Sequence, residues 1–171
     1  PRRHPVASPG RTGTFPPVKK KLTSVVPAYN EAANIAQLVA ETDRVLAPFS
    51  KKYELSWLFV DDGSRDDTAA RLQALARRDK RVRAVILSRN FGKEVALTAG
   101  LRALDCDAAI VMDADLQHPP RYLPQFIAAW ETGAQIVVGR RTDYTRQPWP
   151  KRFGSWLFYR LINSMADFKL E

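Results

Sequence analysis

Five short apolar runs, each followed by a stretch with helical spacing or a polar loop, constrain the fold of this chain most strongly. The five runs cover residues 22–27, 53–60, 82–87, 108–112 and 136–138. The stretch after the first run places Ile35, Leu38 and Val39 three and four positions apart, as on one face of a helix. This alternation predicts an α/β fold with a mostly parallel central sheet and helices on both faces.

Local signals indicate where the helices begin. Asn30 is expected to cap the first helix, and Ser64 or Asp66 the second, because their side-chain oxygens can accept first-turn N–H groups. The remaining helices are expected at residues 93–105, from Pro119 or Pro120 onward, and at residues 150–165.

The first 21 residues differ from the rest of the chain in charge and composition. They carry six of the nine net positive charges and no acidic residue, and they are rich in Pro and Gly. Residues 1–21 are therefore interpreted as a disordered basic tail, and residues 22–171 as a single domain. The tail is either a solvated leader or an arm attracted to anionic lipid. Nucleic acid is a weaker third choice, because aromatic residues are not interleaved with the charges.

Two absences in the sequence narrow the class of protein further. No run of about 18 apolar residues exists, so no membrane-spanning helix is predicted within this sequence. Cys106 is the only cysteine, which excludes a disulfide within the chain and a cysteine-based metal site.

Polar residues follow four of the five runs directly. They are residues 27–31 (PAYNE), Asp61 with Asp62, residues 113–115 (DAD) and residues 139–141 (GRR). In parallel α/β sheets, ligands bind beyond the carboxyl ends of the strands. Four separate loops thus bring polar groups to one edge, where we expect the functional site.

The aspartate pair after the fourth run indicates a metal site. In extended chain, residues i and i+2 point the same way, so Asp113 and Asp115 are expected to share one side. Two such carboxylates suit Mg²⁺ or Mn²⁺, which also accepts phosphate oxygens. Gln117 continues the alternation and would add a neutral oxygen. The alternative is a solvated turn that caps the helix entered at Pro119, where His118 is also expected.

The loops after the first three runs offer groups for a nucleotide. Asp61 or Asp62 could accept hydrogen bonds from a base or a ribose hydroxyl; Asp62 is preferred and Asp61 stays open. Tyr29 could stack on a base, and Glu31 could contact ribose or base. Lys93 either approaches a phosphate or is a surface lysine at a helix start. The structural alternative for these loops is a set of turns and helix caps.

The last expected helix, residues 150–165, has two different faces. Arg152, Ser155, Tyr159 and Asn163 form one polar stripe, and another side is apolar and aromatic. Such a helix either packs against the domain or lies at a membrane interface.

Seven segments together closely resemble one family. They are VPAYNEAANI, VDDGSRDDT, RNFGKEVALTAG, VMDADLQHPP, VVGRR, KRFGSWLFYRLIN and DFKL, in that order. The chain resembles, over about residues 22–171, the family 2 glycosyltransferases that act on polyisoprenyl phosphates, relatives of dolichyl-phosphate mannose synthase. The resemblance implies a GT-A fold and inverting transfer from a UDP- or GDP-sugar. It also implies a polyisoprenyl-phosphate acceptor and a Mg²⁺ or Mn²⁺ cofactor.

The resemblance also implies roles for individual residues. The metal ligands would be Asp113, Asp115 and Gln117. The nucleotide would lie near Pro27, Tyr29, Glu31, Asp62, Asp113 and Ala114. The donor diphosphate and the lipid phosphate would be bound by Arg141, Arg152, Ser155 and Tyr159.

The sequence departs from the family pattern in two places. Only residues 164–166 separate Asn163 from Asp167, where the family has a longer loop, and the membrane-spanning helices common in the family do not follow before Glu171. We expect a location on the cytoplasmic face of a membrane, and the sequence is compatible with a homo-oligomer.

Three rival classes of protein share some of these sequence features. A sugar-1-phosphate nucleotidyltransferase would carry a Gly-rich loop where residues 27–31 stand. A nucleic-acid binder is suggested by the pI near 10.0, but most excess charge lies in the tail, so no nucleic-acid partner is expected. A glycosyltransferase with a protein or small-sugar acceptor remains the main alternative.

Overall fold

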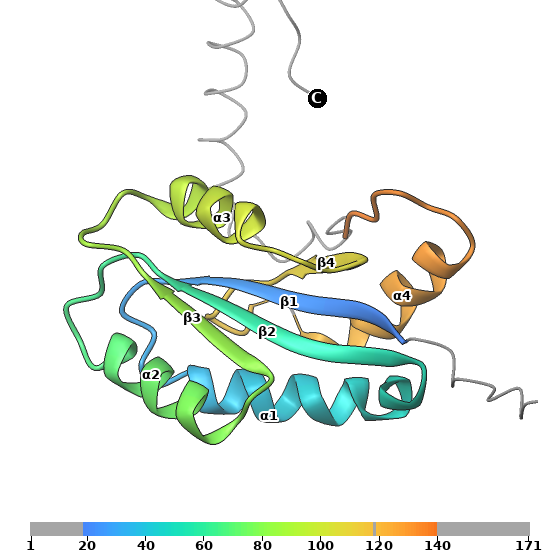
Figure 1. Cartoon of the computed structure of the whole chain (residues 1–171), viewed down its shortest axis with the longest axis horizontal. Helices are drawn as coiled ribbons and strands as arrows, with labels where there is room; N and C mark the ends of the chain where they lie inside the picture. The colour runs from blue at the N-terminus through green and yellow to red at the C-terminus, as the bar shows by residue number, and fades with distance from the viewer. Residues whose placement is uncertain (1–18, 118, 140–171) are drawn as a thin grey trace, which may run out of the picture. The chain divides into compact units, whose positions relative to one another are not determined.

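The computed structural model describes residues 19–117 and 119–139, and its centre is a four-stranded sheet (Figure 1). The strands are β1 (Lys20–Ala28), β2 (Tyr53–Asp61), β3 (Val82–Ile86) and β4 (Ala108–Val111). Their order is β3-β2-β1-β4, and all three neighbouring pairs are parallel. The predicted parallel α/β architecture is confirmed.

The helices connect the strands from both faces of the sheet. Figure 1 shows α1 (Ile35–Leu46) and α2 (Thr68–Arg78) on one face and α3 (Lys93–Arg102) on the other. The 3₁₀ turn η1 (Ala47–Lys51) follows α1, and η2 (Pro120–Tyr122) leads into α4 (Leu123–Glu131). Pro120 thus opens the fourth helical segment, as expected. None of the described helices is long and apolar enough to cross a bilayer.

The two central strands form the core. Val25 and Val26 of β1 and Phe59 and Val60 of β2 are completely buried, as expected for strands covered on both faces. α3 approaches this sheet closely at Gly100, where a Cβ atom would lie 2.9 Å from Val60 Cγ2. The packed core fixes where the strands end, and it therefore fixes the loops that follow them.

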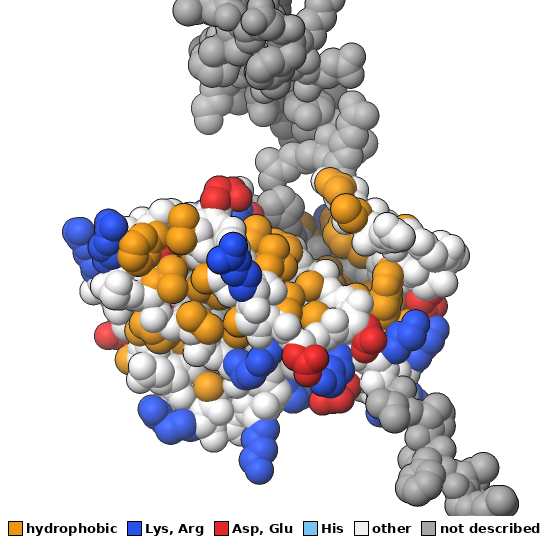
Figure 2. All heavy atoms as spheres, turned by 45° about the horizontal axis from the view of Figure 1, so that its top comes forward, with side chains coloured by type: hydrophobic (Ala, Val, Ile, Leu, Met, Phe, Trp, Pro, Cys, Tyr) orange, Lys and Arg blue, Asp and Glu red, His pale blue; other side chains and the backbone are white. Residues whose placement is uncertain are grey.

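The α3 side of the molecule carries apolar side chains on its surface (Figure 2). Val95 and Leu101 of α3 are exposed, as is Val111 of β4, which is the register partner of Val25. The exposed surface of α3 therefore includes apolar side chains as well as polar ones.

Several element boundaries differ from those expected. β1 starts at Lys20, because the ladder with β2 extends to Tyr53, so the strand includes the last two residues assigned to the tail. α3 ends at Arg102 rather than residue 105. Asn30 does not cap α1: the helix starts at Ile35, and Asn30 has a φ of 57°.

The prediction of a fifth strand at residues 136–138 is wrong. These residues form no strand, and Ile136 and Val138 are 83% and 79% exposed. Apolar β-branched residues favour a strand, but a strand exists only where a neighbour completes its ladder. Residues 136–138 pair with no strand in the part of the chain that the structure describes.

Contacts within the chain separate a unit that ends at Ala128 from a second unit, Ala129–Glu171. The candidate site lies within the first unit. Most of the tail and the expected helix at residues 150–165 lie outside the described residues.

Candidate functional site

A cleft of about 280 Å³ opens at the carboxyl edge of the sheet. Four loops contribute to its lining, and each follows a different strand. The lining residues are Pro27, Ala28, Tyr29 and Glu31 after β1, Asp62 after β2, Asn90, Gly92 and Lys93 after β3, and Asp113, Ala114 and Asp115 after β4. The structure therefore brings together most of the described residues that the sequence singled out.

Two carboxylates and one ammonium group lie in the part of the cleft next to β4. The Lys93 Nζ atom is 2.6 Å from Asp113 Oδ1, and the two side chains are 56% and 24% exposed. Asp115 lies two residues further along the same loop and also lines the cleft. The Lys93 ammonium shows that Asp113 is accessible to a cation.

The donor set suits one kind of metal site. The described residues contain no group of three or more His, Cys, Asp or Glu side chains that could hold an ion. Mg²⁺ usually binds through one or two carboxylates, several waters and substrate phosphates. Asp113 and Asp115 fit that mode, in which the substrate completes the coordination.

The expected alternation does not extend to Gln117. β4 ends at Val111 and the chain turns at Leu116, whose φ is 60°. Gln117 is exposed and does not line the cleft, so the premise that it continues an extended strand is wrong. Its backbone N–H instead donates a 3.0 Å hydrogen bond to Asp115 Oδ1. Gln117 therefore helps to orient Asp115 through its backbone.

Asp61, the last residue of β2, and Asp62, which follows it, are both buried but differ in their partners. Asp62 accepts hydrogen bonds from the backbone N–H groups of Phe91 at 2.8 Å and Gly92 at 2.9 Å. Asp61 accepts hydrogen bonds from the hydroxyl and the backbone N–H of Ser64. Of the two, only Asp62 lines the cleft.

Gly63 allows these two loops to touch. Its φ is 65°, which L side chains rarely adopt, and a Cβ atom there would lie 2.3 Å from the backbone carbon of Arg89. The loop after β2 and the loop before α3 are thus in backbone contact, so Asp62 can reach the N–H groups of Phe91 and Gly92.

A second set of hydrogen bonds joins the loop after β1 to the start of α2. The backbone N–H of Asn30 donates to Ser64 Oγ, and Asn30 Oδ1 accepts from the N–H of Arg65, both at 2.9 Å. The N–H of Glu31 donates to Thr68 Oγ1 at 2.9 Å. These bonds hold Tyr29, which is 37% exposed, and Glu31 at the rim of the cleft.

The expected cap of α2 is present in a modified form. The N-cap position is Asp67, which makes no side-chain cap bond. Asp66 accepts instead from the N–H and the hydroxyl of Thr68, the first helical residue. The Thr68 hydroxyl lowers the pKa of Asp66 below its ordinary value.

Sequence reasoning missed two contributions to the site. Asn90 lines the cleft, and the N–H groups of Phe91 and Gly92 anchor the loop before α3. The residue types of Asn90, Phe91 and Gly92 do not signal a place in a cleft or a backbone hydrogen bond to a distant aspartate. His118, Arg141, Arg152, Ser155 and Tyr159 lie outside the described residues, and the roles expected for them stay predictions.

The fold and the cleft define a parallel α/β protein with an acidic cleft at the carboxyl edge of its sheet. The chain belongs to glycosyl transferase family 2, whose model matches residues 23–170. The family expected from the sequence motifs is confirmed.

Curated relatives agree with this membership. The bactoprenol glucosyl transferase of Shigella phage SfX is 38% identical over 151 residues, which cover 88% of this chain and 49% of the relative. The undecaprenyl-phosphate 4-deoxy-4-formamido-L-arabinose transferase of Proteus mirabilis is 37% identical over 154 residues, covering 86% and 46%. The chain thus spans about half the length of the curated relatives it matches.

Solved structures confirm the GT-A fold. The Pyrobaculum calidifontis mannosyltransferase PcManGT, in complex with GDP-Man and Mn²⁺, matches with a TM-score of 0.53 and 23% identity, covering 80% of this chain and 40% of that one. Glucosyl-3-phosphoglycerate synthase from Mycobacterium tuberculosis, in complex with Mn²⁺, UDP-Glc and phosphoglyceric acid, matches with a TM-score of 0.57 and 24% identity, covering 85% and 50%.

Proposed function

We propose that this chain carries the donor site of a glycosyltransferase that moves a sugar from a UDP- or GDP-sugar to a polyisoprenyl phosphate. The observation that carries the proposal is the cleft in which Tyr29, Asp62, Asp113 and Asp115 meet, in a chain that belongs to family 2. The acceptor is inferred from relatives named for bactoprenol and undecaprenyl phosphate, both polyisoprenyl lipids.

The nucleotide is proposed to lie between the loops after β1 and β2. The exposed Tyr29 ring offers a stacking surface for the base, and Glu31 and Asp62 line the same cleft as acceptors for base or ribose groups. Pro27 and Ala114 would pack against the nucleotide. Asp61 is given no substrate contact, because it does not line the cleft and its carboxylate is bound to Ser64.

The diphosphate is proposed to lie next to Asp113 and Asp115, which would hold Mg²⁺ or Mn²⁺. When bound, such an ion stabilises the charge that develops on the leaving nucleoside diphosphate. Lys93 lies beside Asp113 and can offer a further positive charge. Arg141 and Arg152 are proposed to bind phosphate groups as well.

The acceptor needs little activation. A phosphate monoester is already anionic at neutral pH, so its oxygen can attack the anomeric carbon without a strong general base. Catalysis is therefore proposed to rest on positioning and charge stabilisation, with inversion as the result of direct displacement. We place the protein at the cytoplasmic face of a membrane, where the lipid phosphate and the nucleotide sugar meet.

A donor screen tests the proposed function. The full chain is incubated with radiolabelled UDP- or GDP-sugars, a short polyprenyl phosphate and Mg²⁺ or Mn²⁺. Labelled product is expected in the organic extract, and only with the lipid phosphate present. Label transferred to protein or to a soluble sugar would support the second candidate, a glycosyltransferase with a non-lipid acceptor.

Arg152→Ala tests the acceptor assignment. The variant is expected to raise the KM for polyprenyl phosphate more than the Kd of the nucleotide donor, and Arg152→Lys is expected to retain part of the function. Equal losses for donor and acceptor would contradict the assignment of Arg152 to the lipid phosphate.

A further inference from the structure

Lys93 lines the cleft and contacts Asp113, one of the two residues proposed to bind the metal. It is the first residue of α3, and its Nζ atom is 2.6 Å from Asp113 Oδ1. The acidic residues that line the cleft are Glu31, Asp62, Asp113 and Asp115, and Lys93 is the basic residue among its described lining. Its charge therefore offsets part of the repulsion between Asp113 and Asp115.

A buried carboxylate fixes the turn that precedes Lys93. Asp62 is 3% exposed, and its two oxygens accept the backbone N–H groups of Phe91 and Gly92 at 2.8 and 2.9 Å. Hydrogen bonds from N–H groups to an ionised carboxylate are short and strong. The end of β2 therefore determines where α3 begins, and with it where the Lys93 side chain starts.

We propose that Lys93 is a resident counter-cation of Asp113, that a divalent cation must displace it, and that Asp62 is the residue that positions it. The inference rests on the proposed function, since it concerns the same aspartates. The ammonium group and a divalent cation compete for the Asp113 carboxylate. A bound nucleoside diphosphate gives Lys93 a new partner, so diphosphate and cation bind cooperatively.

The expected size of the effect follows from the exposure of the pair. Ion pairs near a surface contribute little, because solvent screens them and two long side chains lose freedom. Removal of Lys93 is therefore expected to change cation affinity by roughly two- to five-fold.

The experiment measures the Mn²⁺ Kd of the full chain by the electron paramagnetic resonance signal of free Mn²⁺, with and without UDP or GDP. Lys93→Met is expected to bind Mn²⁺ more tightly than the wild type when no nucleotide is present. The factor by which the nucleotide tightens Mn²⁺ binding is expected to fall in the same variant. Unchanged or weaker Mn²⁺ binding in nucleotide-free Lys93→Met overturns the proposal.

Lys80→Met is the matched control. Lys80 is exposed and lies just before β3, at the opposite end of the strand from Lys93, so its removal takes away the same charge far from the cleft. Its Mn²⁺ affinity is expected to equal that of the wild type. An equal gain in both lysine variants would mean that net charge alone sets the affinity, which also overturns the proposal.

A double-mutant cycle tests the positioning role of Asp62. Asp62→Asn removes a negative charge, which weakens Mn²⁺ binding directly, but it also loosens Lys93, which favours Mn²⁺. The loss of affinity is therefore expected to be smaller in the wild-type background than in Lys93→Met. Backbone amide exchange at Phe91 and Gly92 is expected to accelerate. Equal factors in the two backgrounds would show that Asp62 does not act through Lys93.

Asp115→Ala separates this inference from the proposed function. If it removes Mn²⁺ binding while Lys93→Met changes nothing, the metal site stands and only the counter-cation role fails. If Asp115→Ala leaves Mn²⁺ binding unchanged, Asp115 does not hold the cation, and the proposed metal site fails together with the counter-cation role, while the donor screen still decides the sugar transfer.

Discussion

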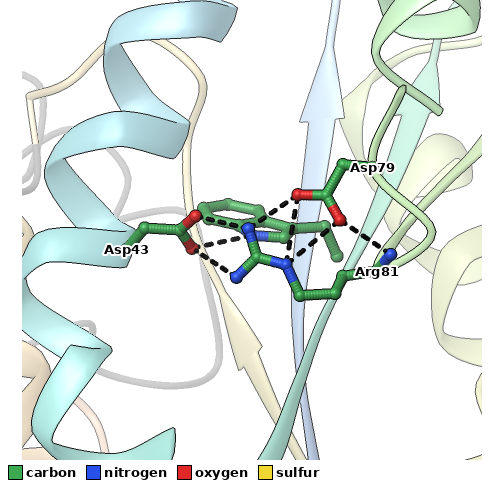
Figure 3. Close-up of polar contacts among 4 residues, drawn as sticks. Asp43, Asp79 and Arg81 are labelled. Atoms are coloured by element: carbon green, nitrogen blue, oxygen red, sulfur yellow. Dashed lines mark hydrogen bonds and ion pairs between the residues drawn. The ribbon is translucent and has the colours of Figure 1, made fainter. Parts of the chain in front are cut away.

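The two edges of the central sheet both hold aspartates beside a cation, but they hold them differently. At the amino edge, the Arg81 guanidinium binds Asp43 and Asp79, with shortest contacts of 2.6 Å to each (Figure 3). At the carboxyl edge, the Lys93 ammonium contacts Asp113 at 2.6 Å. The cation–carboxylate distances are the same at both edges, so the edges differ in the chemistry of the cation, which is a guanidinium at one and an ammonium at the other.

Arginine and lysine differ in how they engage carboxylates. The planar fork of Arg81 makes two hydrogen bonds to Asp43 and three to Asp79, which ties the end of α2 to α1. Lysine is a flexible point charge that a stronger cation can displace. We therefore expect the Arg81 cluster to contribute to stability and the Lys93–Asp113 pair to exchange its partners.

Cavity size alone would single out the amino edge rather than the candidate site. A hollow of about 450 Å³ lies at the amino edge, larger than the cleft of about 280 Å³. It is lined by Lys19, Ser50, Tyr53, Glu54, Leu55 and Arg81. Its Arg81 is already bound to two aspartates, whereas the smaller cleft combines carboxylates from separate loops with an exposed ring. We therefore base the choice of the candidate site on the arrangement of its groups and not on its volume.

The largest effect is expected for Asp115→Ala. Asp115 is proposed to help hold the ion that stabilises charge on the leaving diphosphate, so its loss should reduce transfer by about 100-fold or more, with the circular dichroism spectrum unchanged. Asp105→Ala is the matched control, because Asp105 is an exposed aspartate at the amino edge and is expected to keep full activity. Near wild-type turnover in Asp115→Ala would mean that the carboxyl edge is no more important for activity than the amino edge.

Gly63→Ala is expected to disturb the carboxyl edge through the backbone. The new Cβ atom would lie 2.3 Å from the Arg89 backbone at a φ of 65°, so the free energy of unfolding should fall by roughly 2 kcal/mol or more. Gly133→Ala is the control, since Gly133 also has a positive φ but no atom within 4 Å of the added Cβ. Urea unfolding compares them; equal losses would show that the close approach at Gly63 costs nothing.

The sequence predicted the sheet well because its signals are local and repeated. Apolar runs such as residues 53–60 match a strand within one residue, and the loops after the strands follow from parallel topology. Residues 136–138 show the limit, because a strand depends on a partner that no local pattern reveals.

The candidate site shows the same limit for side chains. Asp113 and Asp115 stand out by spacing, but the bond between Asp62 and the N–H groups of Phe91 and Gly92 joins segments far apart in sequence. Gln117 failed as an extended neighbour because Leu116 adopts a positive φ, which its residue type does not announce.

Arg81→Met sharpens the stability side of the comparison. The variant leaves Asp43 and Asp79 without their shared fork, and the free energy of unfolding is expected to fall by roughly 1–2 kcal/mol. Mn²⁺ affinity and transfer at saturating substrate should not change. Arg77→Met, at an exposed position of α2, is the control. A change in Mn²⁺ affinity in Arg81→Met would show that the edges are coupled.

The amino edge also predicts a pH dependence. The hydrogen bond from Arg81 lowers the pKa of Asp79 below its ordinary value of 3.8. Because the folded pKa is depressed, this stabilisation is present above about pH 4 and is lost as the pH falls through the folded value. The difference in unfolding free energy between wild type and Asp79→Asn should therefore shrink in acid. If the difference in unfolding free energy between wild type and Asp79→Asn stayed constant across pH, the Asp79 carboxylate would not stabilise the fold through Arg81.

The smallest effect is expected for Lys21→Met, which removes another ion pair at the amino edge. Lys21 Nζ is 2.6 Å from Asp105 Oδ2, as close as Arg81 is to its partners, but Asp105 is 86% exposed. The pair raises the pKa of Lys21 and lowers that of Asp105, yet solvent screens most of its attraction. The backbone N–H of Lys21 keeps its 2.7 Å bond to Asp107 in the variant. The urea midpoint is therefore expected to stay at the wild-type value. A loss of stability as large as that of Arg81→Met would mean that any close ion pair stabilises the amino edge. The contrast between the arginine fork and the lysine point charge would then no longer explain why the two edges differ.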